Sequence, residues 1–336
     1  MFDKRIVGGR EAKQGEFPFV AHLSYTRDKM PIQCVGTILH DQIILVPAFC
    51  VVHQGTEQVI RPDELLIGYG SVERSKLRHA RVLEIAVHRK YTHNGIHNNI
   101  ALVRVEPLEF SETVNRIPVF SGSVSARERM EVMGWGADDQ IGAKWSETLK
   151  TTDVRIGDSA RCQRSENYNG VEGRVLCSDN MLNPGHDLCN GEVGAPLVHD
   201  VDGQKQLVGI YSYHIDLSKE GYDLCAKNSS LAYYTHVYSY LDFIASTVGI
   251  PVDTFTKSLH EPAGSPAAPK RLGKGAVAGI AAGSAALALL LFAVLVKVWR
   301  VHQAQKRTAW GHTYELASRT AEDDEDDEIV AIAPSH

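Results

Sequence analysis

The chain lacks an excess of basic residues, which argues against a nucleic-acid-binding protein. Its 336 residues include 35 Lys and Arg against 41 Asp and Glu, for a net charge of −6, whereas nucleic-acid-binding surfaces are basic. Its 28 glycines and 13 prolines are too few for a collagen-like chain. A hydrophobic content of 43% is too high for wholesale disorder. The composition therefore indicates a folded, mildly acidic protein.

The N-terminus lacks a secretory signal, because Met1–Arg5 is short and charged. Yet all six cysteines lie between residues 34 and 225. An even set of cysteines confined to one part of a chain indicates disulfides and an oxidising compartment. We therefore expect the N-terminus to be incomplete or already processed.

Residues 275–296 contain no charged residue and only Ser284 as a polar side chain. A helix of this length spans about 33 Å, enough to cross a bilayer, and a buried core helix is the alternative reading. Gly275, Gly279 and Gly283 recur every four residues, a spacing that would let a second copy of the helix approach closely in a homodimer. The sequence therefore predicts a single-pass membrane protein.

The segments on either side of this span differ in composition. Residues 251–274 contain four prolines, at 251, 262, 266 and 269, without an apolar period and predict a stalk. Residues 297–336 begin basic and end with seven consecutive acids, Glu322–Glu328, which predicts a disordered tail, either a docking segment or a solvated one without a partner. The charge flanking the span slightly favours a cytoplasmic C-terminus, and the cysteines then place the N-terminal part outside the cell.

Short β-branched and aromatic runs, separated by turn residues, fill residues 6–250 and predict an all-β barrel or sandwich. One helix is expected over Val237–Thr247, because Tyr240, Leu241 and Ile244 share a face. The expected strands are Phe17–Tyr25, Thr37–Val46, Glu64–Gly68, Arg81–His88, Ile100–Val105, Met130–Met133, Leu207–Tyr213 and Tyr233–Val237.

Six strings occur in a fixed order: RIVGG at 5–9, LVPAFC ending at 50, NNIALVRV at 98–105, GWG at 134–136, DLCNGEVGAPLV at 187–198 and VGIYSY at 208–213. Together they resemble the trypsin-like serine protease family, over residues 6–250. The resemblance implies two six-stranded antiparallel β-barrels with the active site between them and a C-terminal helix. Residues 1–5 would be the remnant of a pro-segment. The implied disulfides are Cys34–Cys50, Cys162–Cys177 and Cys189–Cys225.

Acyl transfer in this family needs a hydroxyl nucleophile, an imidazole base and a carboxylate that orients the imidazole. The resemblance implies that Val193, Phe49 and Asn99, respectively, occupy these positions. An isopropyl group cannot attack a carbonyl, a phenyl ring cannot accept a proton, and an amide cannot take the place of the carboxylate. His53 and His97 lie nearby in the sequence, but a base without a nucleophile does no acyl transfer. The sequence therefore predicts that the protein is not an enzyme.

The resemblance also assigns a specificity pocket to Asp187, His214 and Ala232. Asp187 keeps the charge that selects Lys or Arg in the family. His214 and Ala232 replace glycines of the pocket wall, so we expect obstructed entry and an internal pair between Asp187 and His214.

In the family, cleavage ahead of the IVGG string frees an amine that pairs with an acidic residue beside the nucleophile. Here Ile6 and Glu192 take those places, so the Arg5–Ile6 bond is a candidate vestigial processing site. This pair would order the oxyanion loop at Gly191. Asn228 begins an N-glycosylation triplet, Asn228–Ser230.

Three readings follow from these residues. The preferred one is an inactive homologue on a membrane that binds an extracellular protein as a receptor, decoy or inhibitor, although no residue identifies that partner. The second is a membrane-anchored endopeptidase with unorthodox catalysis. The third is a decaying paralogue without a selected role. None of them calls for a metal or a cofactor.

Overall fold

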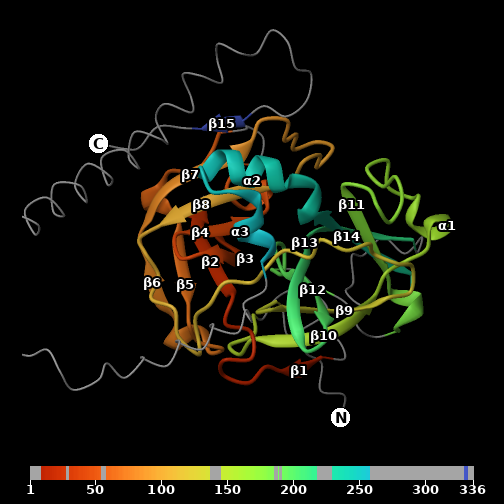
Figure 1. Cartoon of the computed structure of the whole chain (residues 1–336), viewed down its shortest axis with the longest axis horizontal. Coiled ribbons are helices and arrows are strands. Elements are labelled where there is room, and N and C mark those ends of the chain that lie inside the picture. The colour runs from red at the N-terminus through yellow and green to blue at the C-terminus, as the bar shows by residue number, and fades with distance from the viewer. Residues whose placement is uncertain are drawn as a thin grey trace, which may run out of the picture. The chain divides into compact units, whose positions relative to one another are not determined.

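The computed structural model describes residues 9–27, 30–53, 58–136, 145–184, 188, 191–217, 229–257 and 329–331. Two antiparallel sheets form most of this part of the chain, and Figure 1 shows them as a red-to-orange group and a green group. Their strand orders are β15-β7-β8-β4-β3-β2-β5-β6 and β1-β10-β9-β12-β13-β14-β11. The predicted all-β class with a C-terminal helix is confirmed.

The first sheet is built from the N-terminal half of the chain. Its strands are β2 (Val20–Arg27), β3 (Met30–His40), β4 (Ile43–Val46), β5 (Leu66–Tyr69), β6 (Arg78–Ala80), β7 (Val82–His88), β8 (Ala101–Val105) and β15 (Ile329–Ala331). Only Arg81 separates β6 from β7, although these two strands lie near opposite ends of the sheet order. The continuous chain from β6 to β7 therefore links the two ends of the sheet.

The second sheet follows in the chain. Its strands are β1 (Arg10–Glu11), β9 (Arg129–Gly134), β10 (Lys150–Arg155), β11 (Val175–Asp179), β12 (Pro196–Val201), β13 (Gln204–Asp216) and β14 (Ser230–His236). A bridge between Ile156 and Ser178 joins the chain after β10 to β11 near the far end of the sheet order. Asp202 and Gly203, with φ of 52° and 80°, form the left-handed turn that connects β12 to β13.

The predicted six strands per sheet differ from the observed eight and seven. In the first sheet, Arg81 divides one long run into β6 and β7, and β15 is added beyond β7. In the second sheet, the short strand β1 is added beside β10. Six strands remain in each sheet when β6 and β7 are counted together and the two added strands are set aside.

Two of the three implied disulfides are confirmed. Cys34 pairs with Cys50, and Cys162 pairs with Cys177, with Cα atoms 6.2 and 6.0 Å apart. Cys189 and Cys225 lie outside the described residues. The first disulfide joins β3 to the 3₁₀ turn Ala48–Cys50 and so fixes that turn against the sheet.

The described residues contain three short helices: α1 (Ser159–Cys162), α2 (Leu241–Val248) and α3 (Val252–Thr256). The 3₁₀ turn Val237–Tyr240 and α2 occupy the predicted helical segment. The folded chain continues past the expected boundary at Ile250, because Phe255 of α3 is 1% exposed and its carbonyl accepts a hydrogen bond from the N–H of Val119. The first seven residues assigned to the stalk therefore belong to the folded part.

Several expectations concern segments that the structure does not describe, among them residues 1–8, 185–187, 189–190, 218–228 and 258–328. They include the stalk beyond residue 257, the span at 275–296 with its three glycines, the start of the tail, and the site residues Ile6, Asp187 and Asn228. Among the described residues, no helix is both long enough and apolar enough to cross a membrane.

Strand β15 comes from the predicted tail and pairs antiparallel with β7, with Val330 opposite Val87. A tail on the far side of a membrane could not reach this edge of its own folded domain. The pairing of β15 with β7 and the location of the tail in the cytoplasm therefore exclude each other.

Candidate functional site

The three positions that the resemblance assigns to a triad come from separate segments of the chain. Phe49 lies in the 3₁₀ turn after β4, Asn99 precedes β8, and Val193 lies in the loop before β12. The backbone N–H of Phe49 donates to Oδ1 of Asn99 at 2.9 Å. Phe49 and Val193 are both partly buried against the core of the first sheet. The structure therefore brings together the three positions that the sequence singled out.

Asn99 is 2% exposed, and both ends of its amide are hydrogen-bonded. Oδ1 accepts from Phe49, and Nδ2 donates to Oγ of Ser212 at 2.7 Å. Ser212 lies at a bulge, where the register between β13 and β14 shifts between Tyr211 and Tyr213. An amide suits this position because one partner is a donor and the other accepts.

The hydroxyl of Ser212 accepts a hydrogen bond from Asn99, and Asn99 cannot act as a base. An amide Nδ2 has no lone pair with which to take a proton, so Asn99 cannot activate this serine as a nucleophile. The serine is itself buried, at 6% exposure. It holds the frame in place.

The imidazole that lies against Phe49 belongs to His93, which sequence reasoning did not single out. The two rings stack at 5.8 Å with an interplanar angle of 8°, and Nδ1 of His93 lies 3.3 Å from the hydroxyl of Tyr91. The backbone N–H of His53 donates to the carbonyl of Gln58 at 2.7 Å. Among the described residues, His97 has no hydrogen bond to Phe49, Asn99 or Val193. Two stacked aromatic rings therefore lie at the position that the resemblance assigns to the base.

The loop at Gly191 keeps a conformation that requires glycine. Its φ is +86°, and a Cβ atom there would lie 1.6 Å from Cζ3 of Trp145. Gly194 has a φ of +93° and donates its N–H to the carbonyl of Tyr211 at 2.8 Å. On the other side, the N–H of Val35 in β3 donates to the carbonyl of Val193 at 2.8 Å. The turn is thus formed, with the indole of Trp145 packed directly on it.

Glu192 is fully buried. Its side chain packs on Gly134 and Gly136 of the GWG string, where an added Cβ would lie 3.3 and 2.2 Å from the nearest Glu192 atom. Both positions are therefore glycine because a larger side chain would collide with Glu192. The expected partner, Ile6, is outside the described residues, so the activation pair stays a prediction.

His214, which the resemblance assigns to the specificity pocket, contacts a side chain that sequence reasoning missed. Tyr211 is 2% exposed, and its hydroxyl lies 3.1 Å from Nδ1 of His214. His214 pairs with Ala232 across β13 and β14, as expected for two wall residues. The expected ion pair between Asp187 and His214 stays a prediction, and the described partner of His214 is Tyr211. The aromatic residue in the VGIYSY string was the signal available for it.

Two loops beside this pocket are joined directly. Nδ2 of Asn167 donates to the carbonyl of Gly95 at 2.6 Å, and the hydroxyls of Ser165 and Tyr213 lie 2.6 Å apart. Burial raises the pKa of the Tyr213 hydroxyl, so this group stays neutral. These contacts tie β13 and the loop at Gly95 to the segment that carries the Cys162–Cys177 disulfide.

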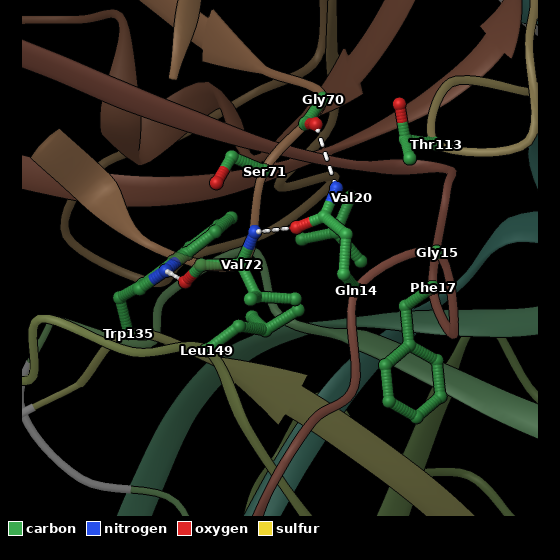
Figure 2. Close-up of a pocket in the computed structure, with 10 residues that line it drawn as sticks. All are labelled: Gln14, Gly15, Phe17, Val20, Gly70, Ser71, Val72, Thr113, Trp135 and Leu149. Carbon is green, nitrogen blue, oxygen red and sulfur yellow. Dashed lines mark hydrogen bonds between the residues drawn. The ribbon is translucent and has the colours of Figure 1, made fainter. Parts of the chain in front are cut away.

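Figure 2 shows a separate small cavity beside Trp135. Gln14 donates to the carbonyl of Gly70 at 3.0 Å and accepts from the N–H of Val72 at 3.1 Å. Trp135 donates its indole N–H to the carbonyl of Val72 at 2.8 Å. A volume of about 10 Å³ holds at most one water molecule. The cavity therefore has no room for a substrate or cofactor, and the described ranges contain no cluster of metal-binding side chains.

The two antiparallel sheets, the two disulfides and the short C-terminal helix are those of a chymotrypsin-type serine protease domain. In agreement, the family named Trypsin matches residues 6–244, and the chain belongs to this family. It is 30% identical to mouse vitamin K-dependent protein C, over 74% of this chain and 52% of that protein. It is 27% identical to human transmembrane protease serine 11B, over 73% of this chain and 56% of that protein. The chain thus spans about half the length of these relatives.

Proposed function

We propose that this protein is a catalytically inactive member of the trypsin family that is displayed on a membrane and binds another protein as a receptor, decoy or inhibitor. The observation that carries this proposal is the intact hydrogen-bonded frame around Phe49, Asn99 and Val193. These positions bring together a phenyl ring, an amide and an isopropyl group. Without a triad, the fold retains roughly 10³–10⁴-fold acceleration over water, which is too little for useful turnover.

Partly exposed aromatic side chains support a binding role. Phe49 and His93 stack on each other, Trp145 lies against Gly191, and all three are partly exposed, and aromatic side chains are enriched in protein interfaces. The resemblance assigns His214 to the specificity pocket, and the hydroxyl of Tyr211 lies 3.1 Å from its Nδ1. A partner would therefore contact this aromatic rim rather than insert a Lys or Arg side chain.

Display on a membrane is supported by the composition of residues 275–296. One relative is also named a transmembrane protease. In this proposal the N-terminal domain is extracellular, the tail is cytoplasmic, and Gly275, Gly279 and Gly283 allow a homodimer.

The second candidate is a membrane-anchored endopeptidase with unorthodox catalysis, which the preserved turn at Gly191 favours. A fluorophosphonate probe, which labels activated serines, separates the two when it is applied to the full chain. We expect no labelling and no cleavage of Lys- or Arg-containing peptides. Labelling, or cleavage that is lost on substitution of Asn99 or Val193, would establish the second candidate and overturn the first.

The binding role is tested by capture of extracellular proteins on the tethered full chain, followed by their identification. Trp145→Ala and Asp187→Ala report on the former cleft, and Phe110→Ala, whose side chain is 43% exposed in a loop outside it, is the matched control. Loss of one captured protein with Trp145→Ala alone, or with both cleft variants, supports the proposal. Equal capture by all variants would refute the assignment of binding to the cleft.

A further inference from the structure

The segment from Arg74 to Arg81 has the sequence RSKLRHAR, with four basic residues, one histidine and no acid. This composition contrasts with the net negative charge of the whole chain. The segment contains β6, which stands at the end of its sheet order and pairs only with β5. The side chains of Lys76, Arg78, His79 and Arg81, called the basic ridge below, are all exposed.

Two glycines, Gly68 in β5 and Gly70 directly after it, fix the backbone of the ridge. A Cβ on Gly68 would lie 2.8 Å from Cδ1 of Leu77, and one on Gly70 would lie 3.1 Å from Nη2 of Arg78. The guanidinium of Arg78 lies over the ring of Tyr69 at 4.8 Å, a cation–π contact that orients the charge. The central cation of the ridge is therefore held in place before any ligand arrives.

The charges of the ridge are only weakly compensated. Among the described residues, no carboxylate forms an ion pair with Arg78 or His79. Lys76 pairs with Glu73 at 2.8 Å and Arg81 with Glu106 at 3.7 Å, but these cations are 66% and 76% exposed. Exposed pairs of this kind contribute little and are readily screened, so a polyanion can displace them.

The ridge offers repeated charge without an apolar anchor. Leu77 and Ala80, which alternate with the basic residues, are buried at 9% and 7% exposure, and Arg78 covers Tyr69. Protein partners usually place aromatic or aliphatic side chains at the centre of an interface, and the ridge itself presents none. We propose that the basic ridge binds a sulfated polysaccharide, whose repeated anions match the closely spaced cations of β6 and of the positions flanking it.

Charged side chains on an edge strand also prevent aggregation between sheet edges, and this role alone requires no ligand. The test uses heparin as the probe and the full chain in detergent micelles. The ridge variant carries Lys76→Gln, Arg78→Gln and Arg81→Gln. The control variant carries Lys13→Gln, Arg129→Gln and Arg155→Gln, which remove the same charge at exposed sites outside the ridge.

At low ionic strength we expect the ridge variant to bind heparin on the order of a hundredfold more weakly, since three cations near an anionic surface are lost. The control variant should stay within about threefold of the unmodified chain, as general surface charge contributes less at such sites. The single variants Lys76→Gln and Arg81→Gln, at highly exposed positions, should each give part of the loss without affecting the fold. Equal weakening by the ridge and control variants, or no heparin binding at all, would overturn the proposal. Competition by poly-L-glutamate as effective as that by heparin would also overturn it, in favour of an acidic protein segment.

Discussion

Replacing Asn99 with Asp tests the hydrogen bonds that join Asn99 to Phe49 and Ser212. The substitution keeps the shape of the side chain but places a carboxylate where exposure is only 2%. Phe49 N–H can still donate to it, and Ser212 can rotate its hydroxyl to donate as well, but Nδ2 is lost. Among the described residues, no cation contacts Asn99. We therefore expect burial to raise the pKa of the new carboxyl by about two units, which is about 3 kcal/mol at neutral pH.

The sign of the pH dependence follows from this raised pKa. The folded variant binds a proton more tightly than the unfolded variant. Its loss of unfolding free energy relative to the unmodified chain is therefore largest at neutral pH. The deficit shrinks as the pH falls through the raised pKa toward about 4, the ordinary value for Asp. Urea unfolding at several pH values measures this loss of stability. The control is Asn94→Asp at an exposed position, which should change stability by less than about 0.5 kcal/mol.

Adding Phe49→His to Asn99→Asp sharpens this test, because an imidazole at position 49 would offer a donor to the new carboxylate. We expect the pair to recover about 1–3 kcal/mol beyond the sum of the single effects in a double-mutant cycle. A deficit that does not change between pH 4 and 8, or a cycle without coupling, would refute the proposed geometry of the frame.

Two further changes probe the same domain. Gly191→Ala should destabilise by about 1–3 kcal/mol more than Gly203→Ala in thermal unfolding, because both glycines have a positive φ but only Gly191 lies against Trp145; equal losses would contradict the close packing of Trp145. Burial lowers the pKa of His22 to about 4, so the unfolded chain binds the extra proton between pH 6.5 and 4 and stability falls by about 3 kcal/mol across that window. His22→Gln should remove this part of the pH dependence of urea unfolding, and an unchanged slope would argue against a neutral His22.

The sequence was most informative where a cysteine or a glycine marked the chain. Cys50 stands next to Phe49, and the glycines at 191 and 194 lie on either side of Val193, so these two positions could be aligned with the family from the sequence, whereas their assignment to a triad stays a prediction. The run Thr37–Val46 was predicted as one strand, but the chain turns at Asp41 and forms β3 and β4.

What the sequence did not reveal depends on contacts between distant segments. Strand β10 reads KTTDVR, without the apolar alternation of a typical strand, and it exists because it pairs along its whole length with β9. The positions of Trp145 on Gly191 and of Tyr211 beside His214 likewise follow from tertiary packing, which no local pattern predicts.

Strand β15 allows a direct test of the proposed topology. If the chain crosses a membrane at residues 275–296, Ile329–Ala331 cannot pair with β7 of the same molecule, and deletion of residues 321–336 should leave hydrogen exchange in Ala86–His88 unchanged. If the pairing seen here forms, the deletion should expose one edge of β7 and speed exchange there, because backbone N–H groups that face β15 would lose their acceptors. A deletion that preserves residues 329–331, such as removal of 332–336, is the matched control. Exchange is measured on the unmodified chain and on both deletion variants in membranes. Faster exchange in the longer deletion alone would refute a cytoplasmic tail.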